Sequence, residues 1–136
     1  MLIERVVHAL RERFGGSAAA GVGGDGENAA ANHLRAAGLR ILGRNFRTSA
    51  GEIDLVCKDG DVVVFVEVKT RADTNSLPES AVTPRKQRQI SRVAEGYLAR
   101  FGTERPAFRH DVVAVHWSGQ GESVVHHYPS FFEHRP

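Results

Sequence analysis

The sequence predicts one α/β domain built around a mixed sheet, and three observations support that prediction. The chain has 136 residues, of which 41% are hydrophobic, so it can bury one modest core. Two alternating apolar runs meet at a turn near residue 60, which is the pattern of a β-hairpin. Runs with helical spacing lie on both sides of this hairpin. The predicted core order is therefore helix, three strands, helix and strand, with helices flanking the sheet.

A helix appended to this core, with the start of a glycine-rich linker, is predicted over residues 1–16. Apolar side chains recur there at helical spacing: Ile3, Val6, Val7, Leu10 and Phe14. The segment "GVGGDG" at 21–26 has the form of a dinucleotide-binding motif, but no apolar strand precedes it. A flexible hinge is the favoured interpretation, and the core domain is predicted over residues 24–136.

The first half of the core is predicted from capping residues and periodicity. A helix runs from Asp25 as N-cap to about Ala37, and Gly38 has the position of a C-terminal stop. A loosely alternating strand follows at 39–48. Residues 51–70 then contain the two hairpin strands, joined by a predicted two-residue turn at Asp59 and Gly60.

The second half of the core is predicted to contain a loop, a helix and two strands. Residues 71–82 are polar and aperiodic, which indicates an exposed, mobile loop. Thr83 as N-cap and Pro84 as first helical residue begin a helix that runs to about Arg100. Its apolar side chains share one face: Ile90, Val93, Ala94, Tyr97 and Leu98. Strands are predicted at 109–117 and 122–128.

The hairpin gathers charges on one predicted face. With the turn at residues 59 and 60, Glu52 faces Glu67, and Asp54 is a diagonal neighbour of Glu67 at roughly 7 Å. The predicted charged face therefore has these members: Glu52, Asp54, Phe65, Glu67 and Lys69. The opposite face is predicted to be an apolar core surface: Ile53, Leu55, Cys57, Val64, Val66 and Val68. Two carboxylates at this separation can share one Mg²⁺.

A solvated surface pair is the alternative interpretation of Glu67 and Lys69. Two features favour a functional site. Facing carboxylates destabilise an ordinary pair of strands, and a bound cation would remove that repulsion. The run from Val62 to Val66 is also apolar on both faces, which predicts a strand covered on both sides.

This hairpin resembles the D…(D/E)-x-K core of the restriction-endonuclease-like nuclease superfamily, through "GEIDLV" at 51–56 and "FVEVKTR" at 65–71. The chain is most similar to the YraN family of small bacterial proteins, which is related to archaeal Holliday-junction resolvases. Further segments in family order are 26–47, 81–98 and 109–115. The resemblance implies an αβββαβ nuclease core.

The resemblance also implies roles for named residues. Asp54 and Glu67 match the metal ligands, with the Val68 carbonyl and Glu27 as further ligands. Lys69 matches the lysine that positions or polarises the attacking water. Three more residues match family positions and are candidates for a supporting role: Glu52, Gln87 and Asp111.

Two of these assignments have a structural alternative. Glu27 lies in the first turn of its predicted helix, where the helix dipole favours a carboxylate. Asp111 can form a salt bridge with Arg109 or another neighbouring base.

Nucleic acid is predicted to contact the helix that begins at Pro84. Arg85, Arg88 and Arg92 follow i, i+3, i+7 spacing and form one basic stripe opposite the apolar face. Such a stripe can contact phosphates without reading bases, although an ordinary solvated helix face has the same pattern. Lys86 matches the family series, and four arginines extend the predicted surface: Arg40, Arg44, Arg47 and Arg71.

The sequence thus predicts a nuclease that uses Mg²⁺ or Mn²⁺ to hydrolyse phosphodiester bonds, with DNA, branched DNA included, as substrate. A nucleic-acid-binding module without cleavage and an adaptor that docks through its first helix are the alternatives. Presence of all three motif residues, Asp54, Glu67 and Lys69, favours the nuclease. DNA versus RNA and endonuclease versus exonuclease stay open.

Composition sets the expected surroundings. The formal net charge is +2 with 18 Lys and Arg residues, which permits an anionic partner. Cys57 is the single cysteine, which indicates a reducing compartment. The chain shows no signal-peptide pattern and no apolar run long enough for a membrane span, so a soluble, cytoplasmic protein is expected. No organic cofactor is expected, and the resemblance to resolvases implies a homodimer.

Overall fold

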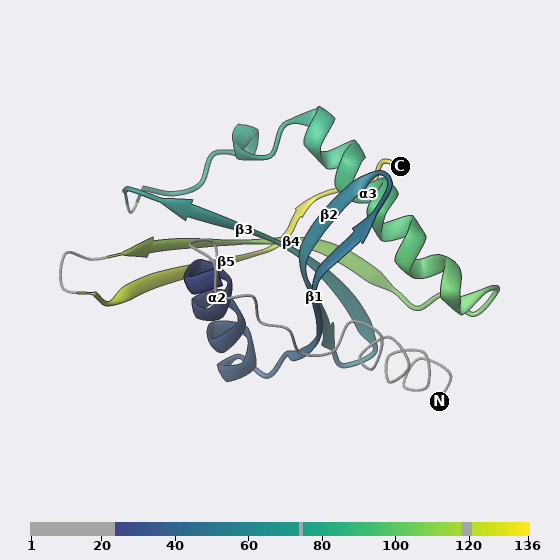
Figure 1. Cartoon of the computed structure of the whole chain (residues 1–136), viewed down its shortest axis with the longest axis horizontal. Coiled ribbons are helices and arrows are strands. Elements are labelled where there is room, and N and C mark those ends of the chain that lie inside the picture. The colour runs from purple at the N-terminus through teal and green to yellow at the C-terminus, as the bar shows by residue number, and fades with distance from the viewer. Residues whose placement is uncertain (1–23, 74, 118–120) are drawn as a thin grey trace.

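Five strands form one mixed sheet at the centre of the computed structural model, which describes residues 24–73, 75–117 and 121–136 (Figure 1). The strands are β1 (Arg40–Thr48), β2 (Gly51–Asp59), β3 (Val62–Arg71), β4 (Phe108–Trp117) and β5 (Ser123–Phe132). They lie in chain order across the sheet. Only the central pair, β3 and β4, is parallel, whereas the other neighbours are antiparallel. The predicted mixed sheet is confirmed, and β3 is its central strand.

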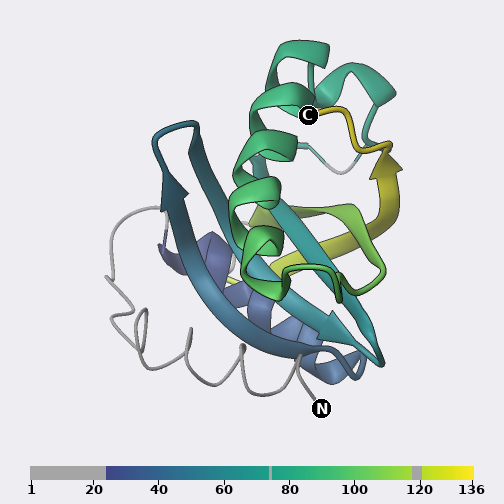
Figure 2. The same cartoon turned by 90° about the vertical axis from the view of Figure 1, so that its right-hand side faces the viewer.

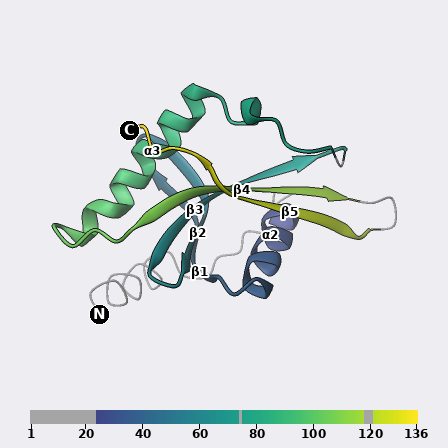
Figure 3. The ribbon, with the colours of Figure 1, turned by 180° about the vertical axis from the view of Figure 1, so that it is seen from behind.

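Two helices cover opposite faces of this sheet. In Figure 2, α3 (Pro84–Leu98) lies in front of the strands and α2 (Gly24–Ala36) lies behind them. Each helix packs on its own apolar cluster. The α3 cluster is centred on Phe46, Ile53, Phe65, Ile90 and Tyr97, and the α2 cluster on Leu34, Ile41, Leu55, Val64 and Val66. Figure 3 shows the same layers from behind. The predicted α/β core, with helices flanking the sheet, is confirmed, and β3 is buried on both sides.

Helix α3 begins and packs as predicted. The Thr83 side chain accepts a hydrogen bond from the Lys86 backbone N–H at 3.2 Å, and Pro84 is the first helical residue. The five side chains predicted for the apolar face are all buried. A short 3-10 turn, η2 (Ala99–Phe101), ends the helix, and another, η1 (Glu79–Ala81), interrupts the loop before it. The predicted cap and the predicted buried face are confirmed.

Helix α2 begins at Gly24, so residues 24–26, predicted as part of a flexible hinge, are helical. Gly26 is buried, and a Cβ atom at this position would lie 2.9 Å from the Thr70 Oγ1 atom. This close approach of the helix to β3 explains a glycine inside a helix. Gly38 has φ +94° and follows the helix end, as predicted. The appended helix predicted over residues 1–16 lies outside the described residues.

The turn between β2 and β3 differs from the predicted one. Asp59 pairs with Val62, so Gly60 and Asp61 are the two turn residues. Gly60 has φ +59°, whereas Asp61 has no positive φ. This combination fits a type II′ turn, which requires glycine at its first central position, rather than the type I′ turn that Asp-Gly favours.

The register of the hairpin changes with the turn. Each β2 residue faces a β3 residue two positions further along than predicted, and the ladder runs as far as Leu55 opposite Val66. The next residues along the two strands are Asp54 and Glu67. The predicted pairing of Glu52 with Glu67 is therefore wrong, and Asp54 is the residue that the register directs toward Glu67.

A twist in β1 and β2 also overturns one predicted side-chain direction. Asn45, with φ +52°, lies opposite Asp54 in the β1–β2 ladder. On one side of this point Leu55 packs in the α2 cluster, and on the other side Ile53 packs with Phe46 in the α3 cluster. Ile53 was predicted to share a face with Leu55, which is wrong because the strands change phase at the Asn45 position.

The C-terminal strand is longer than predicted and leads the chain back to α3. Strand β5 continues to Phe132, four residues beyond its predicted end. The last residues then approach the helix, where the Arg135 backbone N–H donates to the buried Ser91 hydroxyl at 3.0 Å. No helix among the described residues has the length and apolar character needed to cross a membrane.

Candidate active site

Asp54 and Glu67 meet where the β2–β3 ladder ends. The Val68 backbone N–H donates to the Asp54 carboxylate at 2.8 Å, so a side chain takes the place of the next backbone acceptor. The Glu67 carboxyl group lies beside the Asp54 carboxylate, close enough that each group changes the pKa of the other. Both residues are half-buried. The structure thus brings together the two carboxyl groups that the sequence predicted as metal ligands.

Burial raises the pKa of both carboxyl groups of this pair. The pKa of Glu67 is raised to about 7, first by burial and then by the neighbouring Asp54 charge. Burial also raises the pKa of Asp54, against the effect of its hydrogen bond from Val68. Two carboxyl groups in contact cannot both ionise without strong repulsion. Near neutral pH the pair therefore shares a proton.

The donor set of this pair suits a divalent cation with few protein ligands. In an extended strand the N–H and C=O of one residue point to the same side. The Val68 carbonyl therefore points toward Asp54, as its N–H does. Two carboxylates, one carbonyl and water are ligands that Mg²⁺ accepts. Within the described residues, no group of three His, Cys, Asp or Glu side chains is placed to hold a metal.

Glu27 lies in a second acidic group beside this pair. The Asn45 amide lies between the Glu27 and Glu52 carboxylates. With its NH₂ group turned toward them, it donates to Glu52 at 2.6 Å and to Glu27 at 3.2 Å. Burial raises the pKa of Glu27, and the Asp54 charge adds to this shift. Glu27 therefore interacts electrostatically with Asp54 of the carboxyl pair, while its direct contact is with Asn45.

Two lysines act on the carboxyl pair. Lys69 lies on β3 two residues after Glu67, on the face covered by α3, and Lys86 lies in the first turn of α3. Both positive charges lower the pKa of Glu67, and the effect of Lys86 is the larger. Lys86 also lowers the pKa of Asp54. The sequence assigned Lys86 to the nucleic-acid surface and missed its proximity to the carboxyl groups.

The site lies within the part of the chain that matches a known family. The model of a family described as uncharacterised protein family UPF0102 matches residues 26–115. The chain belongs to this UPF0102 family, the family it resembles under the name YraN. A UPF0102 protein of Symbiobacterium thermophilum is 55% identical over 95 residues, which cover 69% of this chain and 80% of that protein.

Two further UPF0102 proteins resemble a larger share of the chain. The protein of Anaeromyxobacter dehalogenans is 45% identical over 113 residues, covering 82% of this chain and 84% of its own length. The protein of Geobacter metallireducens is 43% identical over 113 residues, covering 82% and 92%. The family match includes the whole carboxyl pair and both lysines, and it ends before β5.

The predicted arginine stripe of this UPF0102 protein lies on the outer side of α3. Arg85, Arg88 and Arg92 are all exposed, whereas Lys86 and Gln87 are half-buried. None of the three arginines forms an ion pair with another described residue. The stripe is therefore available to a polyanion, and its role in nucleic-acid binding stays a prediction.

Three of the other predicted arginines contact nearby residues, and the fourth is exposed. The Arg71 side chain pairs with Asp73 at 3.1 Å and donates to the Asn75 carbonyl oxygen at 2.6 Å, so it holds the loop after β3. Arg44 contacts the Asn28 side chain of α2. Arg47 forms a surface ion pair with Glu52 at 3.5 Å. Arg40 is exposed at the start of β1. A continuous surface with the α3 stripe stays a prediction.

Gln87 and Cys57 have structural surroundings in this UPF0102 chain. The Gln87 amide donates to the Val82 carbonyl oxygen at 2.9 Å at the start of α3, while its own oxygen is buried and has no partner among the described residues. Burial raises the pKa of the Cys57 thiol to about 12, so it stays protonated and is a poor nucleophile.

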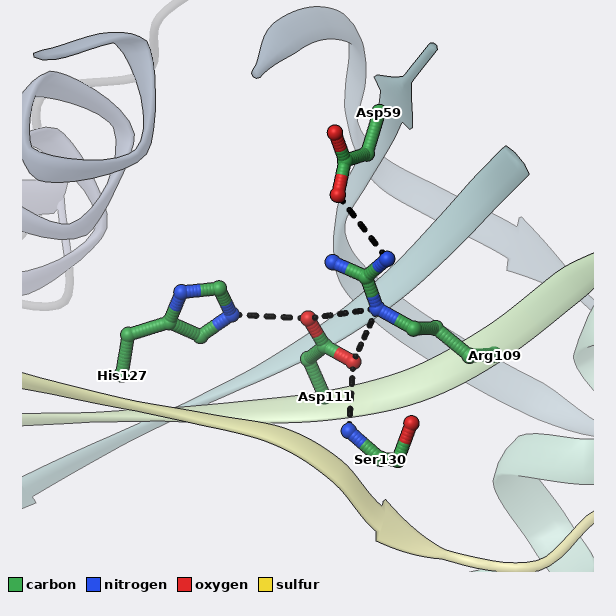
Figure 4. A network of polar contacts seen from close by, with 5 residues as sticks. All are labelled: Asp59, Arg109, Asp111, His127 and Ser130. Carbon is green, nitrogen blue, oxygen red and sulfur yellow. Dashed lines mark hydrogen bonds and ion pairs between the residues drawn. The ribbon is translucent and has the colours of Figure 1, made fainter. Parts of the chain in front are cut away.

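Asp111 lies on the other face of the sheet, in a network of its own (Figure 4). It is the neighbour of Val66 on β3, and its fully buried side chain accepts from three groups. The Arg109 Nε atom lies 3.0 Å away, the His127 Nε2 atom 2.7 Å, and the Ser130 backbone nitrogen 2.9 Å. Although burial opposes ionisation, these donors hold the pKa of Asp111 below its usual value. The salt bridge with Arg109 that the sequence suggested is present, and it lies away from the carboxyl pair.

Proposed function

We propose that this chain is a metal-dependent nuclease that hydrolyses phosphodiester bonds of nucleic acid, with DNA, branched DNA included, as its substrate. The observation that carries the proposal is the close approach of the Asp54 and Glu67 carboxyl groups in a half-buried site. Burial, and after it the Asp54 charge, raises the pKa of Glu67 to about 7. Burying two like charges side by side lowers stability unless a cation or a proton joins them. A strongly perturbed pair of this kind is typical of functional sites.

The residues divide the chemistry among them. Asp54, Glu67 and the Val68 carbonyl would hold Mg²⁺ or Mn²⁺. A bound divalent cation supplies a water of lowered pKa and positive charge beside the phosphate. The Lys69 ammonium, on the same side of the sheet as Glu67, orients the attacking water and stabilises negative charge on the phosphate oxygens. Glu67 must lose its proton to bind the cation, so activity rises as pH increases through about 7.

The exposed outer face of α3 is the evidence for a polyanionic substrate. Three arginines of one stripe are exposed there, on the helix whose first turn carries Lys86. Contacts of this type bind phosphates of any sequence, so they position the chain without selecting bases. The proposal thus combines a cleaving site with a surface that holds the backbone of a nucleic acid.

A cleavage screen tests the proposal. Linear, flapped, four-way and single-stranded DNA and RNA are incubated with Mg²⁺ or Mn²⁺ and with the wild-type chain, Asp54→Asn or Lys69→Ala. Each substitution is expected to reduce cleavage by about 10²- to 10³-fold, the usual effect of losing one group that stabilises transition-state charge. Asp61→Asn, which changes an exposed turn carboxylate, is the matched control and should cleave like wild type. Full cleavage by Lys69→Ala would exclude the assignment.

A nucleic-acid-binding module is the second candidate, and the exposed arginine stripe is the observation that favours it. This candidate predicts that the wild-type chain binds DNA in the screen and cleaves none of the substrates with either metal. It also predicts that Asp54→Asn binds as wild type does. Binding without cleavage would therefore replace the nuclease by this second function.

A further inference from the structure

Lys86 has the helical position of a buried residue. Its spacing to Ile90 and Tyr97 is i+4 and i+11, so it continues the apolar side of α3 toward the helix start. Lys86 is half-buried, whereas its neighbour Arg85 is exposed. The Lys86 backbone N–H donates a hydrogen bond of 3.2 Å to the Thr83 side chain, which fixes the first turn of the helix. The Lys86 side chain is therefore directed to the sheet and not to the arginine stripe.

The sheet face under α3 is the one that holds the carboxyl pair. Residues of β3 alternate, and Phe65 packs in the α3 cluster, which places Glu67 and Lys69 on the same face. Lys86 acts on Glu67 more strongly than Lys69 does, although Lys69 belongs to the motif. Two ammonium groups from separate elements, a strand and a helix, thus approach one pair of carboxyl groups.

Neither the Lys69 nor the Lys86 ammonium group forms a direct ion pair with another described residue. Among the described residues, Lys69 and Lys86 form no salt bridge with any carboxylate, although both charges act on Glu67. Both ammonium groups keep their donors for a further anion beside the carboxyl pair.

We infer that Lys86 is a second phosphate-binding ammonium of the active site, which holds the scissile phosphate from the α3 side while Lys69 holds it from the β3 side. This inference rests on the proposed nuclease function and deepens it. The anion recognised is a phosphodiester whose non-bridging oxygens gain negative charge in the transition state. Because Lys86 faces inward, its loss should lower the rate of cleavage more than the affinity for DNA. The exposed arginines should have the opposite effect.

Three variants test this division. Lys86→Gln removes the inward charge, Arg85→Gln removes the same charge from the adjacent exposed position, and Lys86→Arg keeps the charge. Single-turnover cleavage of the best substrate of the screen is measured with Mg²⁺. Binding of the same labelled DNA is measured by fluorescence anisotropy with Ca²⁺ in place of Mg²⁺, and thermal unfolding shows that each variant is folded.

Lys86→Gln is expected to reduce the single-turnover rate about 100-fold and to change the affinity by less than about threefold. Arg85→Gln should weaken binding more than it lowers the single-turnover rate, and Lys86→Arg should recover a large part of the rate. Equal rates for Lys86→Gln and wild type would overturn the role of Lys86 while leaving the nuclease intact. A wild-type chain that cleaves no substrate would overturn both.

Discussion

A buried and a half-buried carboxylate on opposite faces of the same pair of strands have opposite surroundings. Asp111 on β4 accepts hydrogen bonds from Arg109, His127 and a backbone N–H, and its pKa is lowered. Glu67 on β3 contacts the carboxyl group of Asp54, and its pKa is raised to about 7. Burial opposes ionisation at both positions, so the neighbours decide the difference.

The comparison separates a charge that stabilises the fold from a charge that weakens it. A buried carboxylate surrounded by donors is stable while ionised, and removing it leaves those donors without an acceptor. A carboxyl group that faces another carboxyl group is stable only with a proton or a cation between them. The Asp111 network therefore serves stability, while the pair of Asp54 and Glu67 is the site at which we propose that a cation binds.

Removal of Asp111 should have the largest effect on stability. Asp111→Ala leaves Arg109 and His127 without their shared acceptor and should lower the free energy of unfolding by about 3 kcal/mol, the lower range for breaking a buried pair. Urea denaturation at pH 7 measures the change. Asp61→Asn, in the exposed turn, should stay within about 0.5 kcal/mol of wild type. A loss below about 1 kcal/mol for Asp111→Ala would contradict the comparison.

Removal of the Glu67 charge should raise the free energy of unfolding, whereas removal of Asp111 lowers it. The raised pKa of Glu67 means that the folded chain binds this proton more tightly than the unfolded chain, in which the carboxyl group has its ordinary pKa of 4.5. Its contribution to stability is present below about pH 4.5 and is lost as pH rises through about 7. Without metal at pH 8, Glu67→Gln should therefore be more stable than wild type, by about 1 to 2 kcal/mol given partial exposure.

Magnesium sharpens the same experiment. Addition of Mg²⁺ at pH 8 should raise the free energy of unfolding of wild type and leave that of Glu67→Gln unchanged, because the variant lacks one anionic ligand. Urea denaturation between pH 5 and pH 8, with and without Mg²⁺, provides the measurement. If wild type and Glu67→Gln show the same pH dependence, the shared proton is absent and the comparison fails.

The sequence was sufficient for the elements but not for the side-chain contacts at the site. Periodicity and the Thr83 cap predicted the strands and α3 because local chemistry determines them. The prediction of the turn was wrong because residues 59–61 are Asp-Gly-Asp. A two-residue turn at 59–60 and one at 60–61 both contain the glycine. The spacing of Lys86 to Ile90 was a visible signal that this lysine faces inward. The twist at Asn45 had no comparable signal, because it depends on how two strands curve together.

His110 lies between the two cases and should give the smallest effect. Its Nε2 atom lies 2.9 Å from the His134 Nδ1 atom, while its buried Nδ1 atom has no partner among the described residues. Burial lowers the pKa of His110 to about 4, so the fold keeps the ring neutral. The stability that depends on this neutral ring is present above about pH 6.5 and is lost as pH falls through about 4.

His110→Phe tests this intermediate case, because a phenyl ring can keep the stacking on Phe132, whose ring centroid lies 4.6 Å away. The substitution should change stability by less than about 1 kcal/mol at pH 7.5, where one hydrogen bond is lost and one unpartnered nitrogen is removed. At pH 5 the variant should be more stable than wild type, because its phenyl ring does not bind a proton in the unfolded chain. Urea denaturation at both values measures this, with His126→Phe as the exposed control on β5. Equal pH dependence of wild type and His110→Phe would mean that burial of the neutral His110 ring does not contribute to the pH dependence of stability.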